Sequence, residues 1–121
     1  MKATYETGIR GEEIAEKYLT AQGMRCLARR YREKPGEIDL IMADGDCLVF
    51  VEVKTRFSAG EAGSGLAAVT PGKQRRIARC AMLYAMKHDP SGRYALRFDV
   101  VEVNREGVVH IPNAFQPGGG F

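Results

Sequence analysis

The chain has 121 residues, of which 45% are hydrophobic and 27% are charged, and its formal net charge is +3. This length and three scattered cysteines suit one domain that folds without disulfides or structural zinc, and the composition is too apolar for an intrinsically disordered chain. No apolar run approaches the roughly 20 residues that cross a bilayer, and no apolar signal segment follows Lys2, so we expect a cytoplasmic protein without a membrane partner.

The first half of the chain predicts a helix followed by three strands. Good helix formers over 6–22, ended by Gly23, predict the helix. At 100° per residue, one narrow face of it carries Tyr5, Gly8, Glu12, Ala15 and Leu19. Strands are predicted at 24–31, 37–42 and 47–54, and the segment Asp44-Gly45-Asp46 predicts a hairpin between the last two.

The second half predicts a loop, a second helix and two more strands. Gly, Ser and Ala without a period over 57–69 predict a mobile loop that could close on a substrate. Thr70-Pro71 predicts a helix start, and the buried stripe of that helix is Ile77, Ala81, Tyr84 and Ala85. Strands at 94–103 and 108–111 and a loose tail over 113–121 complete a single mixed α/β domain spanning 1–121.

The predicted hairpin brings carboxylates together. If residues 45–46 are its central turn residues, Asp39 lies opposite Glu52 and Glu37 lies opposite Lys54. Side chains in directly opposed positions have Cβ atoms about 4.5–5.5 Å apart, so Asp39 and Glu52 repel one another. On a solvated face water and salt would screen this repulsion, and that interpretation stays open.

Three further features favour a binding site over a solvated pair. Phe50 shares a face with Glu52, Lys54 lies on the same face, and Glu12 is a third carboxylate on an apolar helix stripe. Hard oxygen ligands suit Mg²⁺ or Mn²⁺, so Glu12, Asp39 and Glu52 are the candidate metal ligands. Lys54 could orient or deprotonate a water, or stay charged and stabilise a transition state. Together these residue types indicate hydrolysis of a phosphodiester.

Basic residues flank the predicted site and predict DNA or another nucleic acid as the partner. Arg56 and Lys73 are the best candidates for phosphate contacts. Arg75 and Arg79 are four residues apart on a helix, where like charges repel unless a phosphate bridges them, although an exposed helix also tolerates that spacing. A second basic cluster at 25–34 is the alternative surface for DNA.

Two acidic positions keep two interpretations each. Asp99 follows an aromatic residue on a predicted core strand and either braces the site or makes structural hydrogen bonds. Glu37 either supports Lys54 or forms a plain cross-strand ion pair.

The motifs around these residues resemble those of known nucleases. Asp39 followed by Glu52-Val53-Lys54 resembles the Asp and Glu-x-Lys signature of the restriction-endonuclease-like superfamily. Glu12 resembles the early helical glutamate of its archaeal Holliday-junction-resolvase branch. Nearly the whole chain is similar to the bacterial YraN-like family, through Gly8-x-x-Gly11-Glu12-x-x-Ala15, Gly36-Glu37-Ile38-Asp39-Leu40-Ile41, the strand 49–56, the helix with Lys73, and Arg97-Phe98-Asp99-Val100-Val101.

This resemblance implies a restriction-endonuclease-like core, with helix, three strands, helix and strand around a mixed central sheet. It also implies a Mg²⁺- or Mn²⁺-dependent endonuclease that acts on DNA, including branched or structured DNA. A homodimer is expected because symmetric cutting of two strands needs two sites, and 108–111 is the expected free edge. Two other functions stay open: a nucleic-acid-binding module that cleaves weakly or not at all within a larger complex, and a structural protein with a charged hairpin.

Overall fold

The chain forms one mixed α/β unit, described here by a computed structural model for residues 2–34, 36–58 and 63–116, with the side chains from residue 7 onward. Its elements are α1 (Lys2–Ala21), β1 (Arg25–Glu33), β2 (Gly36–Asp44), β3 (Cys47–Arg56), the 3-10 helix η1 (Leu66–Ala68), α2 (Pro71–His88), β4 (Ala95–Asn104) and β5 (Gly107–Ile111). The predicted order of helix, three strands, helix and strand is confirmed. All three cysteines are free thiols.

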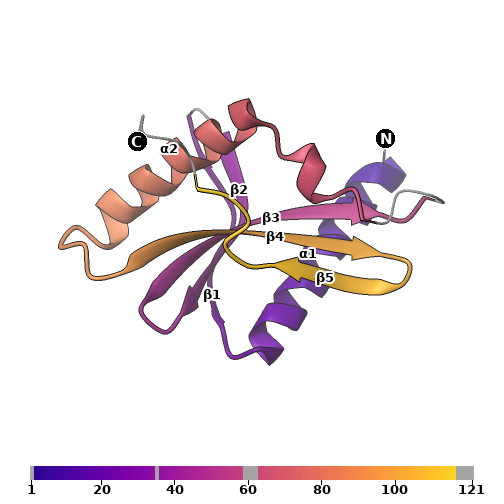
Figure 1. Ribbon diagram of the computed structural model, residues 1–121, viewed down its shortest axis with the longest axis horizontal. Coiled ribbons are helices and arrows are strands. Elements are labelled where there is room, and N and C mark those ends of the chain that lie inside the picture. The colour runs from indigo at the N-terminus through magenta and orange to yellow at the C-terminus, as the bar shows by residue number, and fades with distance from the viewer. Residues whose placement is uncertain (1, 35, 59–62, 117–121) are drawn as a thin grey trace.

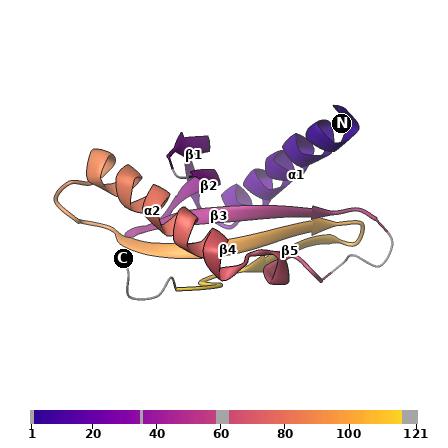
Figure 2. The ribbon, with the colours of Figure 1, turned by 90° about the horizontal axis from the view of Figure 1, so that it is seen from above.

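The five strands form one sheet in the order β1-β2-β3-β4-β5. Only β3 and β4 run parallel, and α2 belongs to the connection between them, whereas the other neighbours are antiparallel. Helices α1 and α2 cover opposite faces of the sheet, as Figures 1 and 2 show. The sheet therefore has two edge strands, β1 and β5, and the expectation that only the last strand offers a free edge is wrong.

Each helix buries one stripe against its own face of the sheet. Ala15 and Leu19 of α1 are fully buried against a cluster of strand residues that includes Val51 and Val101. On the other face, Ile77 and its neighbours on α2 pack against a cluster that includes Phe50. Burying a side chain of this size stabilises the fold by about 1.5–3 kcal/mol.

No helix in the described part of the chain is both long enough and apolar enough to cross a membrane.

Because both faces are covered, the central strands do not alternate between buried and exposed residues. Every residue from Phe98 to the end of β4 is buried, and the strand predicted over 94–103 is confirmed. Two carboxylates, Asp99 and Glu102, are buried in this strand. Buried charges require partners, and both have them, as described below.

Two segments expected to be loose are packed in part. In the predicted tail, the backbone N–H of Ala114 donates to the Phe98 carbonyl over 2.7 Å, and Phe115 stacks on the Phe98 ring. The expectation of a loose tail is therefore wrong for 113–115, and 117–121 lie outside the described residues. In the predicted loop 57–69, η1 forms a short helix, while 59–62 lie outside the described residues.

Candidate active site

The predicted hairpin register is confirmed as far as the strand pairing extends. Leu40 pairs with Val51, and the pairing continues in register to the turn at Asp44 and Cys47. At the other end, the pairing of β2 with β3 stops at Leu40 and Val51. There the Asp39 carboxylate takes the place of a backbone carbonyl as acceptor: Val53 N–H donates to Asp39 Oδ2 over 2.7 Å. Asp39 is thereby fixed beside Val53 in the second half of β3.

Asp39 and Glu52 form a close, poorly solvated carboxylate pair. Burial and the negative charge of Glu52 raise the pKa of Asp39 to about 8, in spite of the hydrogen bond from Val53. Glu52 itself is only 5% exposed. Because Glu52 is buried and Asp39 is half-buried, the interpretation of this pair as a fully solvated face is wrong.

Two lysines supply positive charge to Glu52. Lys54 Nζ lies 3.0 Å from Glu52 Oε2, and Lys73 Nζ forms an ion pair with the same oxygen. Lys73 reaches it from the first turn of α2, where the Thr70 side chain accepts a hydrogen bond from its backbone N–H over 3.2 Å. The predicted threonine cap and N-terminal proline are thus confirmed, and they place Lys73 directly on a site carboxylate.

The surroundings shift the pKa values of the two lysines in opposite directions. Burial, together with the neighbouring Lys73, lowers the pKa of Lys54. Burial also acts to lower the pKa of Lys73, but its hydrogen bond to Glu52 outweighs this, so the pKa of Lys73 is raised. Lys54 is therefore the lysine that gives up its proton more readily, and Lys73 is the one that stays charged.

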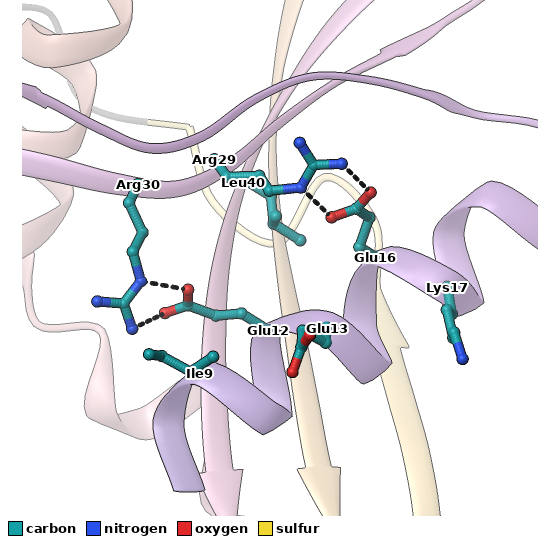
Figure 3. Close-up of a pocket in the computed structure, with 8 residues that line it drawn as sticks. All are labelled: Ile9, Glu12, Glu13, Glu16, Lys17, Arg29, Arg30 and Leu40. Carbon is teal, nitrogen blue, oxygen red and sulfur yellow. Dashed lines mark hydrogen bonds and ion pairs between the residues drawn. The ribbon is translucent and has the colours of Figure 1, made fainter. Parts of the chain in front are cut away.

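Glu12 lies near this cluster but is bound elsewhere. Helix α1 approaches β3 closely at Gly11, where a Cβ atom would come within 2.2 Å of Thr55 Oγ1. The Glu12 carboxylate faces Arg30, whose Nε lies 2.8 Å from Oε1 and whose second nitrogen lies 3.4 Å from Oε2 (Figure 3). Burial raises the pKa of Glu12, Arg30 opposes this, and the charge of Glu52 adds to the rise. Glu12 is thus within electrostatic reach of Glu52, although its oxygens face Arg30.

The oxygen donors of the site fit a hard divalent cation in part. Among the described residues, no three histidine, cysteine or acidic side chains lie close enough together to hold a metal ion. Asp39 and Glu52 nevertheless fit such an ion, because they are adjacent oxygen donors whose repulsion a cation would relieve. Glu12, the third candidate ligand, has both of its oxygens facing Arg30.

A buried carboxylate beside the site escaped the sequence analysis. Glu102 pairs in register with Lys54 and is 2% exposed. Its two oxygens accept backbone N–H groups of Gly63 and Gly65, each over 2.6 Å. Gly63 and Gly65, in the loop predicted to be mobile, are therefore hydrogen-bonded to β4, the strand next to the one that carries Lys54. The available signal was a glutamate inside the apolar run of β4.

The remaining predicted residues divide between the site and the surface. Arg56 lies at the end of β3, where its Nε donates to Ser64 Oγ over 3.0 Å. Arg75 and Arg79 are exposed on α2. Glu37 forms a cross-strand ion pair, but with Arg32 rather than Lys54, at 2.6 Å.

Asp99 has a structural role. Arg97 binds both of its oxygens at 2.9 Å, and Asn113 N–H donates to Oδ1. His110 Nε2 lies 2.7 Å from Oδ2. The pKa of Asp99 is lowered, because these partners outweigh the effect of burial. Since these contacts tie β4, β5 and the following segment together, the structural interpretation of Asp99 is confirmed.

Comparisons with known proteins point to one family. The model of "Uncharacterised protein family UPF0102" matches residues 11–103. A UPF0102 protein of Alkalilimnicola ehrlichii is 46% identical over 114 residues, covering 94% of this chain and 90% of that protein. One from Symbiobacterium thermophilum is 52% identical over 96 residues, covering 79% of this chain and 80% of that protein.

Similarity to solved structures is weak. The structure of Pyrococcus furiosus SfsA in complex with Ca²⁺ matches with 16% identity and a TM-score of 0.35, and the match covers 90% of this chain and 63% of that one. A similarity this low supports no conclusion about function.

Proposed function

We propose that this chain, which belongs to the uncharacterised protein family UPF0102, is a divalent-metal-dependent nuclease that hydrolyses phosphodiester bonds in DNA. The family membership confirms the YraN-like resemblance of its motifs. Because the family description assigns no activity, the proposal rests on the site. The observation that carries it is the pair of half-buried Asp39 and buried Glu52, with Lys54 and Lys73 bound to one oxygen of Glu52.

In this proposal the acidic residues hold the metal and the lysines act on the phosphate and on water. Asp39 and Glu52, joined by Glu12, would hold Mg²⁺ or Mn²⁺, which when bound polarises a phosphate oxygen and lowers the pKa of water. Lys54 takes a proton from the attacking water or, when charged, stabilises negative charge on the phosphate. Its lowered pKa favours the first role. Lys73, which stays charged, suits a phosphate contact.

A second candidate function is favoured by one specific contact. The Glu12 carboxylate is bound to Arg30, so the described residues do not form a ready three-carboxylate cage. A nucleic-acid-binding module that cleaves weakly or not at all would retain such an arrangement. The two functions differ in whether cleavage follows when metal is supplied.

A cleavage screen tests the proposal directly. The full chain is incubated with linear duplex, branched DNA and structured RNA, each with Mn²⁺, Mg²⁺ or EDTA. We expect at least one DNA substrate to be cut with metal and none in EDTA, because the phosphodiester barrier is lowered through the metal site. Binding in EDTA without cleavage in either metal would instead support the binding module, and neither binding nor cleavage would support a structural protein.

DNA binding should depend steeply on salt through the exposed arginines of α2. Replacing Arg75 and Arg79 together with glutamine removes up to two phosphate contacts, so the slope of log affinity against log salt should decrease by about 2. The matched control replaces Arg25 and Arg29, which are also exposed and four residues apart. Fluorescence anisotropy across a salt series measures both slopes. If only the replacement of Arg25 and Arg29 lowers the slope, the DNA-binding surface lies on β1 and not on α2.

A homodimer and a cytoplasmic location stay predictions for this chain. Cutting both strands symmetrically needs two sites related by a two-fold axis. Either edge strand, β1 or β5, could meet a second copy in such an assembly.

A further inference from the structure

Two ion pairs lie side by side in a pocket of about 460 Å³ between α1 and β1. Consecutive residues of β1 bind glutamates one helical turn apart on α1: Arg29 pairs with Glu16, and Arg30 pairs with Glu12 (Figure 3). The side chain of Arg29 is 65% exposed, whereas that of Arg30 is 30% exposed and that of Glu12 is 16% exposed. The Arg29 pair is therefore a surface pair, and the Arg30 pair is the inner one.

Arg30 holds a strained backbone conformation at a position beside the candidate site. Its φ is +50°, in the left-handed region that costs a residue with a side chain about 1–2 kcal/mol. The β1–β2 register runs from Arg29 opposite Leu40 to Tyr31 opposite Ile38, which places Arg30 opposite Asp39. Strain of this kind persists where surrounding contacts maintain it, and it is frequent at functional sites. One contact that holds the Arg30 side chain here is its ion pair with Glu12.

We infer that Arg30 is an internal counter-ion that competes with the metal ion for Glu12, so that assembly of the metal site requires Glu12 to exchange Arg30 for the cation. This inference rests on the proposed function. Both Glu12 oxygens face the Arg30 guanidinium at 2.8 and 3.4 Å, so a metal ion that took them as ligands would compete with the Arg30 charge for the same carboxylate. The exchange would keep a partly buried carboxylate paired with a cation in both states. Arg30 thereby sets the metal affinity of the site.

Calorimetric titration with Mn²⁺ alone tests this inference on the full chain. Arg30→Gln should bind Mn²⁺ at least about tenfold more tightly than the unaltered protein, because a charge-assisted, two-bond competitor is lost. Arg29→Gln is the matched control: it removes the neighbouring pair with Glu16 and should leave the affinity unchanged. Arg30→Gly is the second variant, since glycine adopts the left-handed conformation without strain and keeps the fold stable. It should show the same gain.

The outcomes separate this inference from the proposed function. Adding Glu12→Gln to Arg30→Gln should abolish the gain, because the released ligand is then missing. If the unaltered protein binds Mn²⁺ and both Arg30 variants bind it equally well, the Arg30–Glu12 pair only fixes α1 on β1 and the inference is overturned. If no variant binds Mn²⁺, the proposed metal site itself is wrong. Binding by the Arg30 variants alone would support the exchange.

Discussion

Lys54→Ala is expected to lower metal-dependent cleavage of DNA by about 10²- to 10⁴-fold while leaving DNA affinity nearly unchanged. Lys54 is 15% exposed and lies 3.0 Å from Glu52, so its amine is placed for proton transfer or charge stabilisation rather than for general binding of DNA. One lysine is a small part of a set of phosphate contacts, so binding should persist. Glu52 keeps Lys73 as its partner, and the fold should therefore survive.

Two other variants make this measurement specific. Lys87→Ala removes a lysine from the same protein at an exposed position, where it pairs with Glu33, and should cleave normally. Lys54→Arg keeps the charge but cannot lose its proton. Partial activity of Lys54→Arg would indicate charge stabilisation, and its full loss would indicate proton transfer. Single-turnover cleavage and anisotropy report the two properties separately, and normal cleavage by Lys54→Ala would contradict the mechanism.

Asp39→Asn is expected to stabilise the metal-free protein at alkaline pH. The pKa of Asp39 is raised from near 4 in the unfolded chain to about 8 in the fold, so between these values the folded state binds more protons. The contribution of protonated Asp39 to the free energy of unfolding is therefore fully present below pH 4 and is lost as the pH rises through 8. The loss is about 2–5 kcal/mol, which is on the order of 10 °C in melting temperature for a chain of this size. Asparagine removes the ionisation and its cost.

Thermal scans from pH 4 to 9 in EDTA measure this effect. The Asp39→Asn variant should gain stability relative to the unaltered protein only as the pH rises, whereas Asp46→Asn, at the exposed hairpin turn, should follow the unaltered protein. With millimolar Mn²⁺ the order should reverse, because the metal stabilises only the protein that keeps both carboxylates. Identical pH profiles for Asp39→Asn and the unaltered protein would show that Asp39 is solvated.

The local features that position the site could be predicted from the sequence because short-range rules govern them. The Asp44-Gly45-Asp46 turn sets the hairpin register, and a register fixed at its turn determines which side chains share a face. The Thr70-Pro71 start of α2 likewise follows from capping chemistry within a few residues. These two features were sufficient to predict that Asp39 lies beside Glu52 and that Lys73 lies at the start of a helix.

The sequence by itself therefore determined the order of elements, the carboxylate pair and the residues at its edge, whereas the tertiary structure decided which partners those residues have. Glu12 faces Arg30, Lys73 binds Glu52, and Glu102 holds the loop beside Lys54. Each of these contacts joins elements distant in sequence, and each depends on how the helices and the loop pack on the twisted sheet. Residue spacing predicts which face of a helix packs on the sheet, but not which side chains of other elements each residue meets there. Only the folded chain could therefore show that the third carboxylate is bound to an arginine.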